Sequence, residues 1–381
     1  MSSIKTADVI IVGSGIVGNS CAYYCAKKGL TVIVLEEENI IGNGGSSRNG
    51  GGVRVSGRKS PEIPLAKYAI DNIWPHLADE LGVDIEYEKG GNLRLASDET
   101  EIKSLQEFVE VNRGYGLKLS MLDKQETEKW CPYVNDKIVA SSICFDDGHA
   151  NPLVTTLAFY KRSRELGVRY YTGDKVIQLK KYKDHIHTAV TAGGNVYEAD
   201  NIIIAAGFKT RTLLNTVNAD IPLIPRLIEI FVTEAVPPMF SYMLGTIGAN
   251  GGFYGHQTKH GSFVFGGTSG FESAPQYNLD TAPTLDISAP SIARGVLTYF
   301  PELAKLKIIR TWAGWTDLTT EWIPCIGPVD EAPGLLIAAG FSGHGFCLGP
   351  VVGKIISETI VGEKLCVNYR QLRYNRFQAA Q

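Results

Sequence analysis

Apolar residues follow two kinds of pattern along this chain. Residues 8–12 form a short β-branched run that ends at a glycine, which predicts a buried parallel strand. A helical stretch continues to Lys28, Gly29 closes it, and a second strand is predicted over 30–35. The same α/β style predicts helices over 63–81 and 153–166, and strands over 168–171, 176–179, 186–190 and 201–206.

The pattern changes between about 222 and 318. Alternating residues rich in Phe, Tyr and Val, as in FYGHQTKHGSFVFGG, predict an antiparallel sheet and a separate domain. The α/β style returns with a strand over 335–339, a glycine loop and a helix over 350–361. Residues 42–58 hold seven glycines and three arginines without any period, so we interpret them as a functional loop.

Composition narrows the class of protein. The 381 residues are 44% hydrophobic and 20% charged, which excludes a disordered chain and favours two domains. Lys and Arg number 37 against 40 Asp and Glu, so nothing supports a nucleic-acid partner. No apolar run approaches the roughly 20 residues of a transmembrane helix, so no membrane span is expected. The N-terminal residues MSSIKTAD do not form a signal-peptide pattern.

Seven scattered cysteines form no CxxC pair. We therefore expect neither a metal site nor a disulfide framework, and a cytoplasmic location. Glycine is the unusual residue, because its 41 copies gather in a few clusters rather than in a repeat or linker.

The first glycine cluster is GSGIVG at 13–18, between a predicted strand and a predicted helix. In that context the three glycines permit a tight turn, a close approach to a diphosphate and close helix–strand packing. Glu36 ends the second strand, where a carboxylate can accept both ribose hydroxyls, and it argues against a 2′-phosphate. These features together predict a dinucleotide site.

Two later features favour FAD over NAD. The strand at 201–206 ends in Ala205-Ala206-Gly207, a bend suited to the adenine side of a long cofactor. The C-terminal glycine loop places a helix N-terminus where it can stabilise the charge that a flavin gains on reduction.

The chain resembles the D-amino-acid-oxidase superfamily over nearly its whole length. The residues that carry the resemblance are GSGIVG with Glu36, SSRNGGGVR, DDGHANP, IIIAAG, RTWAGWTDLTTEWIPCIGP and GFSGHGFCLGP. It looks most like the flavin-bearing β subunits of sarcosine, proline, hydroxyproline and opine oxidases or dehydrogenases. The resemblance implies noncovalent FAD, an amino-acid or amine substrate, and oxidation of its C–N bond by hydride transfer to flavin N5.

The fold class expected is α/β plus antiparallel β: a discontinuous Rossmann-like FAD-binding domain with an inserted antiparallel-sheet substrate domain. Residues 1–85, 145–221 and 319–381 are assigned to the former, and 86–144 and 222–318 to the latter. The expected FAD contacts are Gly13, Ser14, Gly15, Ile16, Val17, Gly18, Glu36, Glu37, Ser46, Ser47, Arg48, Asn49, Gly50, Gly51, Val176, Ala205, Ala206, Gly207, Gly314, Gly340, Ser342, Gly343, His344, Gly345 and Phe346.

Five residues are candidates for the substrate side. Arg54 matches a substrate-carboxylate arginine of the family, and the alternative is an arginine that only holds its loop. Arg310 either contacts substrate or forms a structural ion pair. Tyr254 and His256 share one face of a predicted strand, where they either line the pocket or are half-buried sheet residues. His344 either acts as a base or shapes its loop.

Other positions carry weaker interpretations. His149 and His260 are interpreted as polar surface residues. Cys347 replaces a lysine that helps to hold the substrate carboxylate in monomeric sarcosine oxidases, and Gly314 replaces their flavin-linking cysteine. These departures put simple sarcosine oxidase activity in doubt.

Three functions therefore stay open. The first is the catalytic subunit of a hetero-oligomeric dehydrogenase that passes electrons to a partner subunit or a quinone. The second is a self-sufficient oxidase that releases hydrogen peroxide. The third is an inactive flavin-binding assembly subunit.

Overall fold

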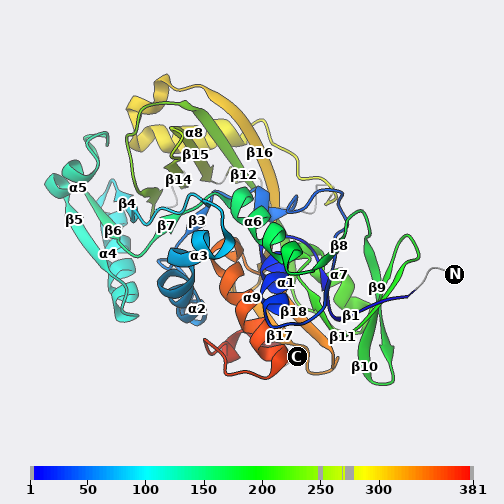
Figure 1. The fold of residues 1–381 in the computed structure, drawn as a ribbon. Coiled ribbons are helices and arrows are strands. Elements are labelled where there is room, and N and C mark those ends of the chain that lie inside the picture. The colour runs from blue at the N-terminus through cyan, green and yellow to red at the C-terminus, as the bar shows by residue number, and fades with distance from the viewer. Residues whose placement is uncertain (1–3, 248–251, 268, 271–278, 378–381) are drawn as a thin grey trace.

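The strands of this protein form two large sheets (Figure 1). The structure is a computed structural model that describes residues 4–247, 252–267, 269–270 and 279–377. The first sheet has the order β17-β18-β11-β1-β2-β8, and β10 and β9 attach beside β11. Parallel pairing joins β1 to β2 and β11, β2 to β8, and β11 to β18. The strands are β1 Lys5–Val12, β2 Val32–Leu35, β8 Arg169–Tyr171, β9 Val176–Tyr182, β10 His185–Thr191, β11 Val196–Ile204, β17 Cys325–Pro328 and β18 Leu335–Ala339.

The second sheet has the order β16-β12-β15-β14-β13-β4-β6-β5 and is antiparallel except where β13 meets β4. Its strands are β4 Asn92–Ala96, β5 Leu119–Asp123, β6 Ala140–Cys144, β12 Leu223–Ala235, β13 Met243–Thr246, β14 Phe253–Gln257, β15 Ser262–Gly267 and β16 Ile308–Thr319. A short pair, β3 Gly52–Val53 and β7 Gly148–His149, lies apart from both sheets. This arrangement confirms the predicted fold class of a Rossmann-like part and a sheet part.

The helices are α1 Ile16–Lys27, α2 Ile63–Tyr68, α3 Trp74–Leu81, α4 Glu99–Gly114, α5 Lys124–Trp130, α6 Pro152–Glu165, α7 Thr210–Asn215, α8 Ser288–Tyr299 and α9 Gly345–Val361. A π-helical segment at Ala69–Ile73 joins α2 to α3, so the helix predicted over 63–81 is present but irregular. None of the described helices is both long and apolar enough to cross a membrane.

Strand β1 is buried on both faces, as the apolar run 8–12 predicts. Val9 and Ile11 pack into one hydrophobic core, and Ile10 and Val12 pack into a second core on the opposite face. A parallel strand covered on both sides needs apolar residues at every position rather than at alternate ones. The position of β1 in the middle of the sheet therefore agrees with its uniformly apolar sequence.

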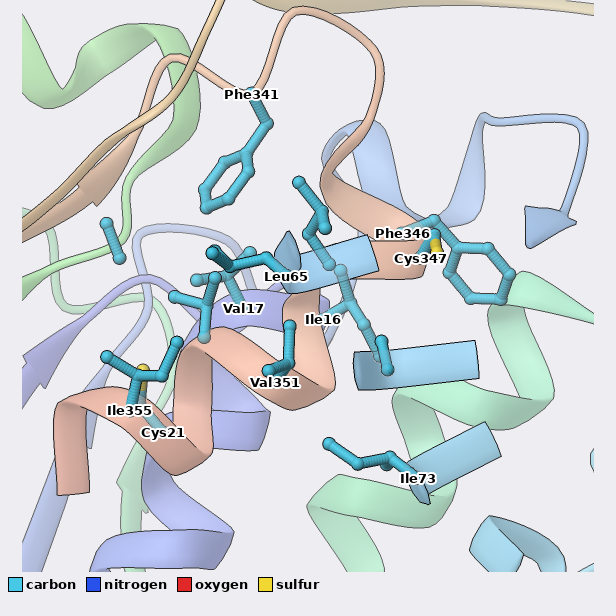
Figure 2. Close-up of a cluster of buried hydrophobic side chains, with 14 of the residues drawn as sticks. Ile16, Val17, Cys21, Leu65, Ile73, Phe341, Phe346, Cys347, Val351 and Ile355 are labelled. Carbon is cyan, nitrogen blue, oxygen red and sulfur yellow. The ribbon is translucent and has the colours of Figure 1, made fainter. Parts of the chain in front are cut away.

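Helices α1 and α9 cross at very close range beneath the predicted cofactor turn. Figure 2 shows Val17 and Cys21 of α1 facing Val351 and Ile355 of α9 in one apolar cluster. A Cβ atom at Gly353 would lie 2.5 Å from the backbone carbon of Ser20, so only glycine allows this approach. The two ends of the chain thus build one layer.

Helix α8 corrects the expectation of strands between 222 and 318. Ile292, Val296 and Tyr299 are buried at helical spacing and pack against the second sheet. The neighbouring Phe- and Tyr-rich strands dominate the composition of this region, and they conceal a helical period only twelve residues long.

Helix α9 begins at Gly345, five residues before the predicted start at Pro350. A proline in this position lacks the N–H that would bond to Phe346, which is the reason for predicting a later start. Phe346, Cys347 and Leu348 are buried, and this burial offsets the missing hydrogen bond. Gly345 and Phe346 therefore belong to the first turn of the helix and not to the loop.

Candidate active site

The GSGIVG turn has the close contacts that its glycines predict. A Cβ atom at Gly13 would lie 2.4 Å from the carbonyl oxygen of Ala205, and one at Gly18 would lie 2.0 Å from that of Gly13. At Gly15 such a Cβ would lie 2.9 Å from the Ser46 hydroxyl oxygen. The N-cap residue of α1 is Gly15, which has no side chain that could cap the helix. The N–H groups that remain free in the first turn therefore suit an anionic group such as a diphosphate.

Polar side chains from two other segments reach the same turn. The backbone N–H and the hydroxyl of Ser14 both donate to the Glu36 carboxylate at 2.7 Å. The Ser46 hydroxyl accepts from the N–H of Ile16 at 2.8 Å. This bond connects the loop at 42–58, called the glycine loop below, to the start of α1. Val17 is buried behind the turn. The structure therefore brings the predicted ribose and diphosphate residues together.

The predicted adenine-side bend lies against this turn. The N–H of Ala205 donates to the carbonyl of Val12 at 2.9 Å, and the chain turns through Ala206 and Gly207, where φ is +55°. Val176 is buried in the same core as Val12. Glu37 turns away to pair with Lys209 at 2.7 Å, just beyond the bend.

The glycine loop lies on one face of the second sheet. A Cβ atom at Gly50 would be 3.0 Å from the ring of Tyr254, and one at Gly52 would be 3.1 Å from the Met243 methyl group. Gly51 has φ +74° and would clash with a backbone carbonyl oxygen at 2.3 Å. The Asn49 side chain accepts from the N–H of Gly51 at 2.8 Å and holds this turn, while Ser47 lies in a short 3₁₀ segment before it.

Arg48 joins the loop to strand β16. Its guanidinium donates to the carbonyl of Ala313 at 2.9 Å, and its own carbonyl accepts from the Trp312 indole at 3.2 Å. A Cβ atom at Gly314 would lie 2.8 Å from the Cβ of Arg48. This arginine therefore supports the loop.

The C-terminal glycine loop is fixed by Asp317 of β16. Its carboxylate accepts from the N–H of Gly340 at 2.7 Å, and its carbonyl accepts from the N–H of Ser342 at 3.1 Å. Burial raises the pKa of Asp317 to about 6, although these backbone N–H groups oppose the shift. Gly343 follows with φ +83°, and the chain then enters α9.

His344, at the start of α9, is held by a buried carboxylate. Its Nδ1 lies 2.9 Å from one oxygen of Glu62 and 3.1 Å from the other. Burial, and then the charge of Arg58, lower the pKa of His344 to about 4, although Glu62 opposes this shift. Burial alone would raise the pKa of Glu62, but the hydrogen bond with His344 and the charge of Arg58 contribute to lowering it below its ordinary value. The His344 ring is therefore neutral at neutral pH and lies within hydrogen-bond distance of the Glu62 carboxylate.

Arg54 lies beside this pair and remains partly exposed. Its guanidinium donates to the Ser56 carbonyl at 2.7 Å. Burial, and then the charges of Arg58 and Arg94, lower its pKa to about 10, so it stays protonated at neutral pH. Burial raises the pKa of Tyr254 to about 12, and the charge of Arg54 opposes this shift. The structure thus brings Arg54, Tyr254 and His344 to one place.

Four charged residues of this place were not identified from the sequence: Arg58, Glu62, Arg94 and Asp147. Arg58 and Glu62 are four residues apart and 3.6 Å from each other, a spacing that does suggest an ion pair. Arg94 interrupts the apolar strand NLRLA, and a cation between two buried leucines is a detectable signal of a polar pocket.

His256 and Arg310 line a cavity of about 560 Å³, whose wall also includes residues 47–50 of the glycine loop. His256 stacks on His149 with ring centroids 3.9 Å apart, and the Arg310 guanidinium lies 5.6 Å from the Trp312 ring. His149 is only 3% exposed, so its interpretation as a surface residue is wrong. The pairing of β3 with β7 places it inside the molecule, whereas the His260 side chain is 70% exposed.

The structure thus has two neighbouring regions on the glycine loop. One holds Arg54, Tyr254 and His344, and the other holds His149, His256 and Arg310. The glycine turn, the Glu36 carboxylate, the loop and the bend after β11 all fit an extended dinucleotide.

Comparisons with known proteins agree with this geometry. Residues 8–359 match the family model described as FAD dependent oxidoreductase. The chain is 26% identical to a subunit of the opine oxidase of Rhizobium meliloti, over 98% of each chain, and 24% identical to glycine oxidase of Bacillus subtilis, also over 98% of each. The crystal structure of L-proline dehydrogenase from P. horikoshii superposes with a TM-score of 0.90, at 26% identity and over 100% of both chains. The chain therefore belongs to the FAD dependent oxidoreductase family, as the resemblance to D-amino-acid oxidases predicts, and FAD is its cofactor.

Proposed function

We propose that this chain oxidises the C–N bond of a small amino acid or secondary amine, as the catalytic subunit of a hetero-oligomeric dehydrogenase. The observation that carries the proposal is the charge around Arg54. Three cations (Arg54, Arg58, Arg94) face two carboxylates (Glu62, Asp147), and His344 is neutral. One positive charge is left over, which a single substrate carboxylate would neutralise.

Arg54 is the proposed carboxylate clamp. Among the described residues no carboxylate forms an ion pair with Arg54. Glu62 instead lies within ion-pair distance of Arg58 and within hydrogen-bond distance of His344. A guanidinium can bind both oxygens of a carboxylate, and this fixes the neighbouring carbon in one orientation. Tyr254 keeps its proton at neutral pH, because its pKa is about 12, and can donate a second hydrogen bond to the substrate. When bound, FAD supplies the hydride acceptor for such a carbon.

We propose that FAD is held noncovalently along the residues predicted for it. Support comes from the glycine turn at 13–18, Glu36, the loop at 42–51 and the helix start at Gly345. Gly314 lies beside Arg48 and has no side chain that could form a covalent link. We also propose the domain division at 86, 145, 222 and 319, which agrees with the separation of the two sheets.

The association with other subunits is proposed on two grounds. One relative that matches over nearly the full length is itself one subunit of an opine oxidase. In addition, the 560 Å³ cavity is lined in part by two exposed apolar side chains, Ile40 (64% exposed) and Leu153 (44%). Apolar side chains exposed beside a cavity are compatible with a surface that a protein partner covers. All seven cysteines are free thiols, which supports a reducing, cytoplasmic location.

The glycine oxidase relative keeps a self-sufficient oxidase as the second candidate function. With oxygen as the sole acceptor, an oxidase releases peroxide at the rate at which substrate is consumed. The proposed dehydrogenase reduces an artificial dye rapidly and forms peroxide only slowly. Measuring both rates on the purified chain distinguishes the two candidates.

The proposal is tested by anaerobic bleaching of the flavin across a panel of L-, D- and N-substituted amino acids. At least one monocarboxylate amine should bleach the wild-type protein. Arg54→Ala should raise the apparent dissociation constant of that substrate at least tenfold, because a charge-assisted hydrogen bond is worth about 1.5–3 kcal/mol. Arg164→Ala, on the exposed face of α6, is the control and should bind normally. Unchanged affinity in Arg54→Ala would remove the clamp, and no bleaching by any amine would refute the activity.

A further inference from the structure

His344 uses only one of its two ring nitrogens within the described part of the chain. Nδ1 bonds to Glu62, whose side chain is fully buried, while the imidazole itself is 12% exposed. Glu62 is in turn 3.6 Å from Arg58, so its carboxylate is held from two sides. Nε2 has no protein partner among these residues, and Arg54 lies close enough to the ring for its charge to lower the pKa of His344.

The charges around the ring determine which nitrogen carries the proton. The groups that face it are Glu62 and Arg58 from the segment before α2 and Arg54 from the glycine loop. The ring is neutral at neutral pH, and an imidazole with one proton places it on the nitrogen that faces an anion. Nδ1 therefore carries the hydrogen, and Nε2 presents a lone pair.

We propose that Glu62 fixes His344 in the tautomer whose Nε2 accepts a hydrogen bond from the substrate nitrogen, so that the site selects amines bearing an N–H over tertiary amines. The inference rests on the proposed function and specifies its substrate class. Glu62 is a positioning residue, and His344 is the residue that contacts the substrate.

The selection follows from the pairing of acceptors and donors. A neutral primary or secondary amine presents an N–H to Nε2, whereas a neutral tertiary amine presents only a lone pair. A protonated tertiary amine could donate, but the cations Arg54 and Arg58 disfavour a further positive charge beside the ring. A site built around an acceptor rejects a ligand that lacks the donor, because the acceptor is then left unpaired.

The first experiment compares matched amines on the holoenzyme under anaerobic conditions. The pairs are N-methylglycine with N,N-dimethylglycine, and proline with N-methylproline, and the quantity is the ratio of kcat/KM for flavin reduction. Wild type should favour the N–H member at least tenfold. Glu62→Gln changes no volume, yet its amide can donate to Nδ1 and move the proton to Nε2, so the ratio should fall towards one. Glu198→Gln, beside His187 at 3.9 Å on the first sheet, is the control and should leave the ratio unchanged.

The second experiment reads the tautomer directly and does not depend on turnover. In the ¹⁵N-histidine NMR spectrum, the His344 signals are those lost in His344→Asn, a variant whose amide can still donate to Glu62 but which has no ring nitrogen at the Nε2 position. Wild type should show hydrogen on Nδ1, and Glu62→Gln should show it on Nε2. If Glu62→Gln fails to fold, His344→Asn gives the same test of the kcat/KM ratio.

The outcomes separate the two proposals. A wild-type tautomer with hydrogen on Nε2, or a ratio that neither variant lowers, overturns the role of His344 while the amine oxidation stands. If no amine reduces the flavin, the proposed function fails, and the selectivity that rests on it fails as well, whichever tautomer is found.

Discussion

Asp147 gives a quantitative test of how the glycine loop is held. Its buried carboxylate accepts the backbone N–H groups of Val55 at 2.7 Å and Ser56 at 3.1 Å, together with the Ser56 hydroxyl and the Asn92 amide. Asp147→Ala leaves all of these donors without their acceptor. Each backbone bond to a charged acceptor contributes about 1.5–3 kcal/mol, so the two together predict a loss of about 3–6 kcal/mol in the free energy of unfolding.

The assay is urea unfolding of the apoprotein followed by circular dichroism, with the slope m compared between variants. Asp147→Asn keeps an oxygen facing Val55 and Ser56, but it loses the charge and turns an NH2 group towards the Asn92 amide. A smaller loss than in Asp147→Ala, about 1–3 kcal/mol, is expected. Asp220→Ala removes an exposed pair with Arg211 and should change stability by less than about 1 kcal/mol. The reasoning is refuted if Asp147→Ala falls within about 1 kcal/mol of wild type, or if the Asn variant is as unstable as the Ala variant.

Two further predictions concern the cofactor turn and acid stability. Gly18→Ala forces a Cβ atom against the Gly13 carbonyl, so the purified variant should lose most of its flavin absorbance. Gly114→Ala is the control and should keep its flavin, because a Cβ atom at that position has no neighbour within 4 Å among the described residues outside its own helix. Burial lowers the pKa of His149 to about 4, below the roughly 6.5 of an unfolded histidine, so protonation favours unfolding and stability falls between pH 6.5 and 4. His149→Gln should reduce this loss by up to about 3 kcal/mol in unfolding experiments across that range; an unchanged pH dependence contradicts the assignment.

The dinucleotide turn was predictable because its determinants are local. A strand, three glycines and a helix occupy one continuous stretch of sequence. The spacing of the glycines within this stretch indicates which steric requirement each one meets. Glu36 follows at a fixed interval because β2 must pair with β1 in register. The same logic predicted the bend at Gly207 and the loop before α9.

The charged cluster beside Arg54 was only partly predictable because its members come from distant segments. Arg94 meets Arg54 only once β4 has paired with β13 and β6. Glu62 reaches His344 across more than 280 residues of chain. Single-sequence periodicity contains no information on such pairings, and His149 was misplaced for the same reason.

The order of the strands in the first sheet has a consequence for how the protein acquires its cofactor. Its central strands β1, β11 and β18 begin at residues 5, 196 and 335, and α1 rests on α9, which ends at residue 361. An emerging chain therefore cannot close the layer beneath GSGIVG until α9 has left the ribosome. Contacts of such long sequence separation make folding slow. Flavin capture is accordingly a late event, and the cofactor-free intermediate is the form of this protein most exposed to aggregation during synthesis.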